Sequence, residues 1–299
     1  MKNNHFLLFI LILINFFLIL PLFKYSLTYR KIYANTTQKA LIDYKSPYKP
    51  IVINKDNFPL LDSLSYILVD VDTNTVLAQK NPREKIYPAS ITKLATALTA
   101  LNIYPLEEVI TIPGVYEEGK TMNLVSGEKI TVKSLVEALL VYSANDAAYN
   151  LALHHGNGIP GFIEDMNKLI KKYQIENTNF VNFDGIHDFN HYSTAFDLAQ
   201  LGRLAIKNPI IKDIVRQKQI VVTDIENMYQ HELISTNELL GVVPEIQGLK
   251  TGWTPEASGC FISLINIDGH QLIGVVTQSL DRFNDTKKII EWSKNSIIW

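Results

Sequence analysis

The chain has 299 residues, of which 47% are apolar and 19% charged, a composition typical of a folded globular protein. Its 28 Lys and Arg residues are balanced by 30 Asp and Glu residues, which argues against nucleic acid as a partner. The single cysteine, Cys260, excludes an internal disulfide and a cysteine-rich zinc or iron–sulfur site. A lipidated N-terminal cysteine is excluded as well.

The N-terminal region contains an apolar segment, Phe6–Phe23, in which Asn15 is the only polar residue. A helix of these 18 residues would span about 27 Å, close to the hydrocarbon thickness of a bilayer. No good small-residue cleavage site follows, so an uncleaved anchor is favoured, with a removed signal peptide as the alternative. Basic residues on both sides leave the orientation open. We therefore predict an anchor or signal over residues 1–28 and a linker over 29–62.

After the linker, the apolar pattern of Tyr66–Val71 and Val76–Ala78 predicts a β-hairpin. Helical spacing follows, and helices are predicted from Pro88, from Thr131, from Ser143 to Gly156, over Gly161–Tyr173 and over Thr194–Lys207. Two apolar strands, Cys260–Ile267 and Gln271–Thr277, are joined by an Asp-Gly turn. A last helix is predicted over Thr286–Trp299.

The two β regions must meet to bury their apolar faces, which makes the helices between them an insertion. Both C-terminal strands are apolar nearly throughout, so we expect helices on both faces of the sheet. The prediction for residues 63–299 is an α+β fold with one antiparallel sheet and a helical lobe at about 90–215. The cleft between sheet and lobe is the expected place for chemistry.

Three short motifs lie where such a cleft would form. They are Ser90–Lys93 of the form S-x-x-K, Ser143–Asn145 of the form S-x-N, and Lys250–Gly252 of the form K-T-G. The first two patterns recur elsewhere in the chain, whereas K-T-G occurs once. Only Ser90 opens an apolar helix, where residues three apart lie side by side. Only Ser143 joins two predicted helices.

The trio, in this order, resembles the penicillin-binding serine peptidases and serine β-lactamases. From about Ser63 to the C-terminus the chain resembles the low-molecular-weight D-alanyl-D-alanine carboxypeptidases within that group. The segments that carry the resemblance are Pro88–Lys93, Ser143–Ala148, His191–Ala195 and Gly248–Gly252. Many relatives carry a further C-terminal β domain and an amphipathic anchor helix. This chain ends soon after the predicted sheet, so its anchor is expected at the N-terminus.

A serine hydroxyl is a poor nucleophile until a nearby base takes its proton. Lys93 can be that base only if its pKa falls from about 10.4 towards neutrality, and burial together with the charge of Lys250 would lower it. Ser143 could pass the proton to the leaving amine, and Asn145 could hold the substrate backbone.

The resemblance adds the substrate contacts. It implies an oxyanion hole from the backbone N–H groups of Ser90 and Trp253. It also implies that Lys250 and Thr251 bind the terminal carboxylate of the substrate, so that the K-T-G segment with Gly252 lines the binding site.

Structural roles are the alternative for each motif. Ser90 could cap its helix, and Ser143 with Asp146 fits the S-x-x-D capping pattern. Lys93 and Lys250 could be solvated side chains.

A histidine pair and the single cysteine are candidates for metal binding and for catalysis, respectively. His187 and His191 are four residues apart, a metal-ligand spacing on a helix, but the residues between them indicate a loop, and no metal or other cofactor is predicted. Cys260 lies in an apolar strand and is interpreted as a core residue, not a nucleophile.

The sequence therefore predicts a membrane-anchored or exported serine-type D-Ala-D-Ala carboxypeptidase with its catalytic domain outside the cytoplasmic membrane. Its substrates would be peptidoglycan stem peptides, and β-lactam antibiotics would acylate it. The alternatives are an endopeptidase that cuts peptidoglycan cross-links, a β-lactamase, and a catalytically silent cell-wall or penicillin-binding receptor. The E-x-x-L-N segment of class A β-lactamases is missing, with Glu176–Asn179 the closest approach.

Overall fold

The computed structural model describes residues 49–299. The predicted anchor or signal, Phe6–Phe23, and the first part of the predicted linker lie outside these residues. Within residues 49–299, no helix is long and apolar enough to cross a membrane.

The centre of the described part is a five-stranded antiparallel sheet with the strand order β3-β2-β10-β9-β8. Its strands are β2 (Ser65–Asp70), β3 (Val76–Lys80), β8 (Ile246–Thr254), β9 (Ser258–Ile267) and β10 (His270–Ser279). The N-terminal hairpin β2-β3 joins the C-terminal strands through the pairing of β2 with β10. The predicted meeting of the two β regions is therefore confirmed, as are both predicted hairpins.

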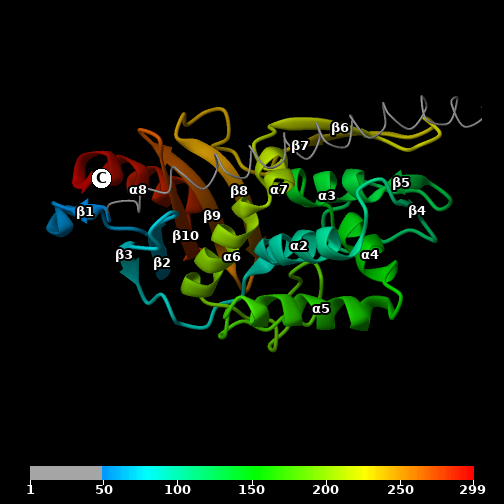
Figure 1. Cartoon of the computed structure of the whole chain (residues 1–299), viewed down its shortest axis with the longest axis horizontal. Coiled ribbons are helices and arrows are strands. Elements are labelled where there is room, and N and C mark those ends of the chain that lie inside the picture. Colours follow the sequence, from blue (N-terminus) through cyan, green and yellow to red (C-terminus); the bar gives the residue numbers. More distant parts are fainter. Residues whose placement is uncertain (1–48) are drawn as a thin grey trace, which may run out of the picture. The chain divides into compact units, whose positions relative to one another are not determined.

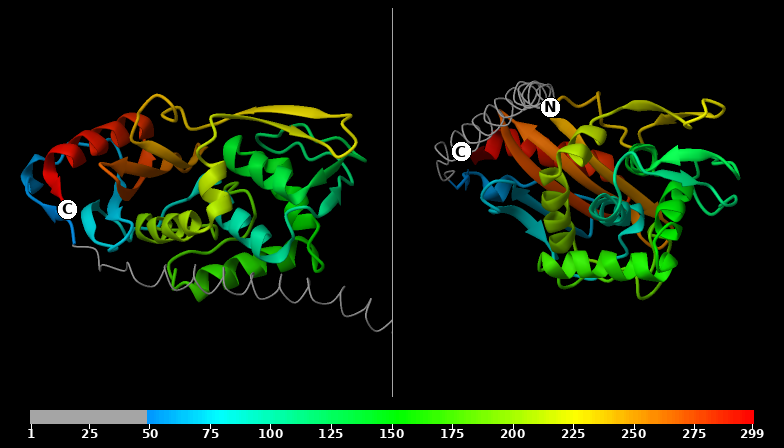
Figure 2. Two further views of the ribbon diagram at one scale, coloured as in Figure 1. Left: turned by 45° about the horizontal axis from the view of Figure 1, so that its top comes forward. Right: turned by 45° about the vertical axis from the view of Figure 1, so that its right-hand side comes forward.

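Helices cover both faces of this sheet, as Figure 1 and Figure 2 show. The helix α6 (Ala195–Lys207) lies on one face and α8 (Arg282–Ser296) on the other. Strand β9 contributes alternate residues to the two cores: Cys260 and Ile262 to the core that contains α6, Phe261 and Ile265 to the core that contains α8. Because successive side chains of a strand point to opposite faces, an apolar run of this kind requires cover on both sides.

The helical lobe is inserted between β3 and β8, as predicted. Besides α6 it contains η2 (Ala89–Thr92), α2 (Lys93–Ile103), α3 (Val132–Val141), α4 (Asn145–Leu153), α5 (Gly158–Lys172) and α7 (Pro209–Ile214). Two predicted helix starts are capped by side chains: Thr131 accepts from Ser134 N–H at the start of α3, and Thr194 accepts from Asp197 N–H at the start of α6. Helix α7 was not predicted; the Asn208 side chain accepts from its first N–H groups, next to Pro209.

Two short hairpins in and beside the lobe were not predicted. They are β4 (Val109–Thr111) with β5 (Lys129–Thr131) and β6 (Gln219–Thr223) with β7 (Gln230–Ile234). Strands of three and five residues give too short a pattern to be recognised in the sequence.

The prediction of a single helix over Thr286–Trp299 is wrong in its bounds. Helix α8 begins at Arg282, because the Asp281 side chain accepts from Asn284 N–H and caps it. It ends at Ser296, and Ile297–Ile298 form strand β11, which pairs with β1 (Ile51–Val52). Helix α5 begins at Gly158, three residues before the predicted start.

Residues 49–62, the last part of the predicted linker, are folded onto this end of the chain. After β1 comes the single turn η1 (Lys55–Asn57), and the ring of Phe58 stacks on Tyr66 and contacts Trp292 edge-on. Leu61 is buried in the core beside α8. The mixed Pro- and Asn-rich sequence of this segment did not predict these contacts. Each is made with a residue far away in the chain, which a local pattern does not indicate.

Candidate active site

Ser90 and Lys93 lie together at the turn that leads into α2. Lys93 Nζ is 2.9 Å from Ser90 Oγ and donates a second hydrogen bond of 2.9 Å to the carbonyl of Asp184. The Ser90 side chain caps no helix end. Lys93 is fully buried, so neither the capping interpretation of Ser90 nor the solvated interpretation of Lys93 describes this pair.

The buried position of Lys93 changes its acid–base chemistry. Desolvation lowers the pKa of Lys93 to about 8, although the nearby carboxylates of Asp184 and Asp146 act in the opposite direction. A lysine with this pKa is partly neutral at physiological pH and can accept the proton of the adjacent hydroxyl. The sequence predicts that the charge of Lys250 also lowers the pKa of Lys93. In the structure, burial is the main cause of the lowered pKa.

Lys250 is as deeply buried as Lys93. Its pKa lies well below the ordinary 10.5, first because of desolvation and then because of the positive charges of Lys93, Lys120 and Arg282. Its Nζ donates to the carbonyl of Thr251 at 3.1 Å.

The K-T-G segment lies on the edge strand β8 and passes beside the Ser90 turn. A Cβ added to Gly252 would lie 3.0 Å from Ser90 N and 3.1 Å from the carbonyl oxygen of Pro88. A side chain at this position would be crowded, so glycine favours this close approach of the strand. Thr251 Oγ1 lies 2.6 Å from Thr236 Oγ1, and the Trp253 side chain is largely exposed. Two of the three motifs therefore meet directly.

The S-x-N segment joins α3 to α4, as predicted. Ser143 has a φ of +72° and is buried. Asn145 is tied to the 118–120 loop: its N–H donates to the Lys120 carbonyl at 2.7 Å and its side-chain amide to the Glu118 carbonyl at 3.0 Å. Within residues 49–299, Ser143 Oγ makes no hydrogen bond to Ser90 or Lys93.

The capping interpretation of Ser143 with Asp146 is wrong. Helix α4 has no side-chain cap. Asp146 instead accepts the N–H groups of Met122 and Leu124, at 3.0 and 3.1 Å, and so holds the 118–124 loop against the start of α4.

Comparison with protein families identifies the family of this chain. Residues 53–280 match the model of the D-alanyl-D-alanine carboxypeptidase family. The chain belongs to this family. The resemblance stated from the motifs is therefore confirmed.

Two curated members of the family illustrate the relationship. The chain is 28% identical over 222 residues to the D-alanyl-D-alanine carboxypeptidase DacF of Bacillus subtilis, covering 72% of this chain and 57% of that protein. It is 29% identical over 251 residues to DacC of Escherichia coli, covering 78% of this chain and 62% of that protein. The chain thus spans about three fifths of the length of these relatives.

A solved structure supports the fold. The crystal structure of the Streptomyces K15 DD-transpeptidase superposes with a TM-score of 0.74 at 29% identity, covering 78% of this chain and 97% of that one. The fold is the one shared by penicillin-binding peptidases and β-lactamases, which confirms the predicted α+β architecture.

Three residues beside the motif residues were not found from the sequence. Arg282 starts α8 beside the β8-β9 pair, and its charge acts on Lys250. Its Nε is buried without a hydrogen-bond partner among residues 49–299. Thr236 faces Thr251, and Asp184 accepts the hydrogen bond of Lys93. None has a local signal, because each reaches the site from a different part of the chain.

Cys260 lies in the core, and the two histidines lie in a loop. Cys260 is fully buried, and burial raises the pKa of its thiol to about 11, which confirms the core interpretation. His187 and His191 lie in the loop that follows Asp184, as the sequence indicated. His187 contacts the ring of Tyr87, and His191 Nε2 lies 2.8 Å from Thr92 Oγ1.

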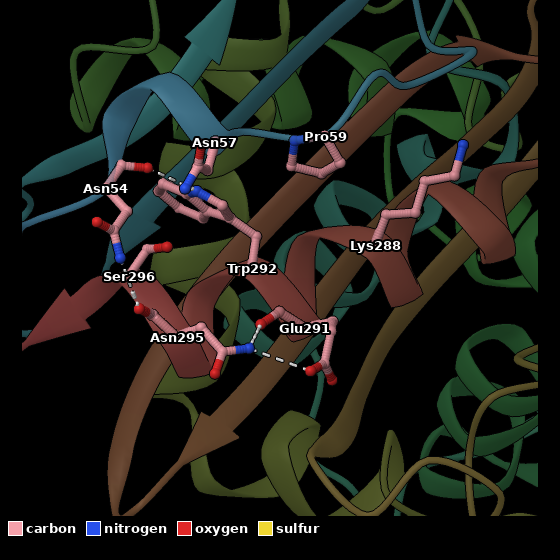
Figure 3. Close-up of a pocket in the computed structure, with 8 residues that line it drawn as sticks. All are labelled: Asn54, Asn57, Pro59, Lys288, Glu291, Trp292, Asn295 and Ser296. Carbon is pink, nitrogen blue, oxygen red and sulfur yellow. Dashed lines mark hydrogen bonds between the residues drawn. The ribbon is translucent and has the colours of Figure 1, made fainter.

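A pocket of about 370 Å³ lies away from these motifs, between residues 54–59 and the C-terminal half of α8 (Figure 3). Trp292 is one of its lining residues, and its indole N–H donates to the Asn54 carbonyl. No residue of the three motifs lines this pocket, so we place the candidate active site at Ser90 and not here.

Proposed function

We propose that this chain is a serine-type D-Ala-D-Ala carboxypeptidase that removes the terminal D-alanine from peptidoglycan stem peptides. The observation that carries the proposal is the 2.9 Å contact between Ser90 Oγ and the buried amine of Lys93, directly beside the K-T-G strand. Burial of a lysine costs free energy, because its charged form loses contact with water. The lowered pKa that results lets the amine accept the proton of the adjacent hydroxyl, as catalytic sites require.

In the proposed reaction, Ser90 Oγ attacks the carbonyl carbon of the penultimate D-Ala while Lys93 Nζ takes its proton. The oxyanion is stabilised by the backbone N–H groups of Ser90 and Trp253. The C–N bond breaks, and the leaving amine of the last D-Ala receives the proton from Lys93 through Ser143. Water then hydrolyses the ester on Ser90. Asn145 holds the substrate backbone.

The free carboxylate of the last D-Ala requires positive charge and donors once water leaves the cleft. Thr251 supplies a hydroxyl, because the partner hydroxyl of Thr236 can donate to it and leave its own proton free. Lys250 and Gly252 belong to the same strand as Thr251, and Lys250 contributes its amine to this part of the site. Arg282 is a further cation for the carboxylate, because a guanidinium stays protonated even where burial lowers its pKa.

We further propose that the catalytic domain acts outside the cytoplasmic membrane. Peptidoglycan is assembled there, and the 18-residue apolar segment Phe6–Phe23 is suited to anchor the chain or to direct its export. A full-length chain that stays in the membrane pellet after alkaline washing would favour the anchor. A mature N-terminus near Tyr29 would favour the removed signal.

Labelling with a fluorescent penicillin tests the nucleophile. The wild-type chain should carry the label on Ser90, located by peptide mapping, and Ser90→Ala should lose it while unfolding at nearly the same temperature. Ser126→Ala is the matched control, because Ser126 is exposed and opens the S-x-x-K copy at residues 126–129. Label on the Ser90→Ala variant would contradict the assignment.

Mass spectrometry of defined muropeptides tests the reaction. Loss of one D-alanine from a monomeric pentapeptide is expected. Cleavage of cross-linked dimers alone would favour an endopeptidase, and transfer to an added amine would favour a transpeptidase. Penicilloyl label that persists for minutes separates the proposal from a β-lactamase, and no turnover of any peptide would indicate a silent receptor.

A further inference from the structure

The peptide group between Ala89 and Ser90 is held tightly on its carbonyl side. Ala89 has a φ of +49°, a left-handed conformation that costs energy for a residue with a side chain. Its carbonyl accepts a 2.9 Å hydrogen bond from Thr92 Oγ1. The backbone of Gly185 lies against the same oxygen, and a Cβ at Gly185 would overlap it. The carbonyl is therefore fixed between two neighbours.

The N–H of the same peptide group belongs to Ser90. In a trans peptide the N–H and C=O point in opposite directions, so the Ser90 N–H points away from Thr92 and Gly185. Gly252 of β8 lies on that other side, with its Cβ position 3.0 Å from Ser90 N. Within residues 49–299 this N–H has no hydrogen-bond acceptor. The direction of the Ala89 carbonyl thus determines where the Ser90 N–H points.

A second hydrogen bond fixes Thr92. His191 Nε2 lies 2.8 Å from Thr92 Oγ1, and the N–H of Val181 donates to His191 Nδ1 at 3.2 Å. Because Nδ1 accepts and the single hydroxyl proton of Thr92 goes to Ala89, the neutral imidazole carries its proton on Nε2 and donates it to Thr92. His191 and Thr92 are both fully buried. Burial lowers the pKa of His191 to about 4, so the neutral ring persists at physiological pH.

We propose that His191 and Thr92 are positioning residues that aim the Ser90 N–H at the oxyanion. The inference rests on the proposed function, in which this N–H is one of two oxyanion donors. Neither side chain touches the substrate. They act through the Ala89 carbonyl, which they hold in place and polarise. Because the Ser90 N–H is then oriented before the reaction, it needs no reorganisation while the oxyanion forms.

The test uses pairs of matched variants. Thr92→Val removes the hydroxyl at nearly constant volume, and Thr92→Ser keeps it. His191→Asn removes the donor at the Nε2 position, and His191→Gln can restore one there. Thr99→Val is the control for loss of a buried threonine hydroxyl, because Thr99 lies on the same helix α2 and its hydroxyl has no partner among residues 49–299.

Stopped-flow acylation by a fluorescent penicillin separates non-covalent binding from the rate constant of acylation. Removal of one oxyanion donor slows catalysis about 100- to 1000-fold, so a misdirected donor in Thr92→Val or His191→Asn should slow acylation by roughly 10- to 100-fold. Binding should change little. Thr92→Ser, His191→Gln and Thr99→Val should stay near the wild-type rate. The double variant Thr92→Val/His191→Asn should be no slower than Thr92→Val, because both changes break one chain of hydrogen bonds.

A boronic acid that forms a tetrahedral adduct with Ser90 gives an independent readout. Its affinity should fall in parallel with the acylation rate, while the pH at which acylation reaches half of its maximum should not move, because Lys93 is unchanged. If Thr92→Val does not fold, the same measurements on His191→Asn and His191→Gln decide the question.

The outcomes separate the inference from the proposed function. Wild-type chain that is not acylated at Ser90 would refute both. Acylation of Ser90 with equal rates in Thr92→Val, His191→Asn and Thr99→Val would leave the proposed function standing and refute the positioning role. A rate loss in Thr92→Val that Thr92→Ser shares equally would also refute it, because the hydroxyl would then not matter.

Discussion

At the scale of single residues, we expect the protonation of Lys93 to govern acylation. With a pKa lowered to about 8, Lys93 is mostly protonated at pH 6 and mostly neutral at pH 9. Only the neutral amine can accept the proton of Ser90, so the second-order acylation rate for penicillin should rise about tenfold per unit from pH 6 to 7 and level off above about pH 8. A profile that stays flat between pH 6 and 9 would show that Lys93 is not the base.

We also expect single side chains to decide recognition of the terminal carboxylate. A hydrogen bond to a charged group contributes about 1.5–3 kcal/mol, so amidation of the last D-Ala should lower kcat/KM by roughly 10- to 150-fold. Thr251→Val and Arg282→Gln should each cause a comparable loss on the acid substrate and little further loss on the amide.

Arg216→Gln provides the charge-matched control for this series. Arg216 donates to Gln247 at an exposed position, so its replacement removes one positive charge without removing a group from the cleft. Its kcat/KM should remain near that of the wild type. Equal cleavage of acid and amide substrates by the wild-type chain would contradict carboxylate recognition and favour an internal-bond endopeptidase.

At the scale of secondary-structure elements, strand β8 lies close to the Ser90 turn, where the proposed oxyanion site would form. In Gly252→Ala the new methyl group would lie 3.0 Å from Ser90 N and 3.1 Å from Ala89 Cβ, so strand and turn must move apart by a few tenths of an ångström. Misplacement by about 1 Å can cost on the order of 100-fold in rate, so this smaller shift should lower the penicillin acylation rate by about 10-fold. The effect on thermal unfolding should be smaller.

A second glycine serves as the control for this prediction. A Cβ at Gly114 meets no atom within 4 Å, so Gly114→Ala should leave the acylation rate unchanged. If Gly252→Ala reacted as fast as Gly114→Ala, the strand would not need to lie this close for catalysis.

At the scale of the whole molecule, residues 49–62 belong to the folded domain. Leu61 is buried, and the N–H groups of Asp62 and Ser63 donate to the carboxylate of Asp285 on α8 at 2.9 and 2.8 Å. Burial of one leucine stabilises a protein by about 1.5–3 kcal/mol. A chain truncated to begin at Ser63 should therefore unfold about 3–12 °C below one that begins at Lys49.

Differential scanning calorimetry of the two truncated chains checks this expectation. Both should be acylated by penicillin, because no residue of the three motifs is removed. Equal unfolding temperatures would show that residues 49–62 behave as the linker that the sequence predicted.

The sequence by itself determined the element types and the motif residues. Apolar runs in β9 and β10 predicted a sheet covered on both faces, and caps and spacing predicted most helices. K-T-G, unique in the chain, together with Ser90–Lys93 indicated the family. These signals are local, since periodicity, capping and turn chemistry each depend on residues within a few positions of one another.

Only the tertiary structure decided which groups surround the motifs. The carbonyl of Asp184, the charge of Arg282 and the hydroxyl of Thr236 reach the site from three separate segments, and His191 meets Thr92 across 99 positions of sequence. The pairing of β1 with β11 joins the two ends of the described chain in the same way. Burial lowers the pKa of Lys93, and burial depends on contacts between residues distant in sequence, which no local pattern encodes.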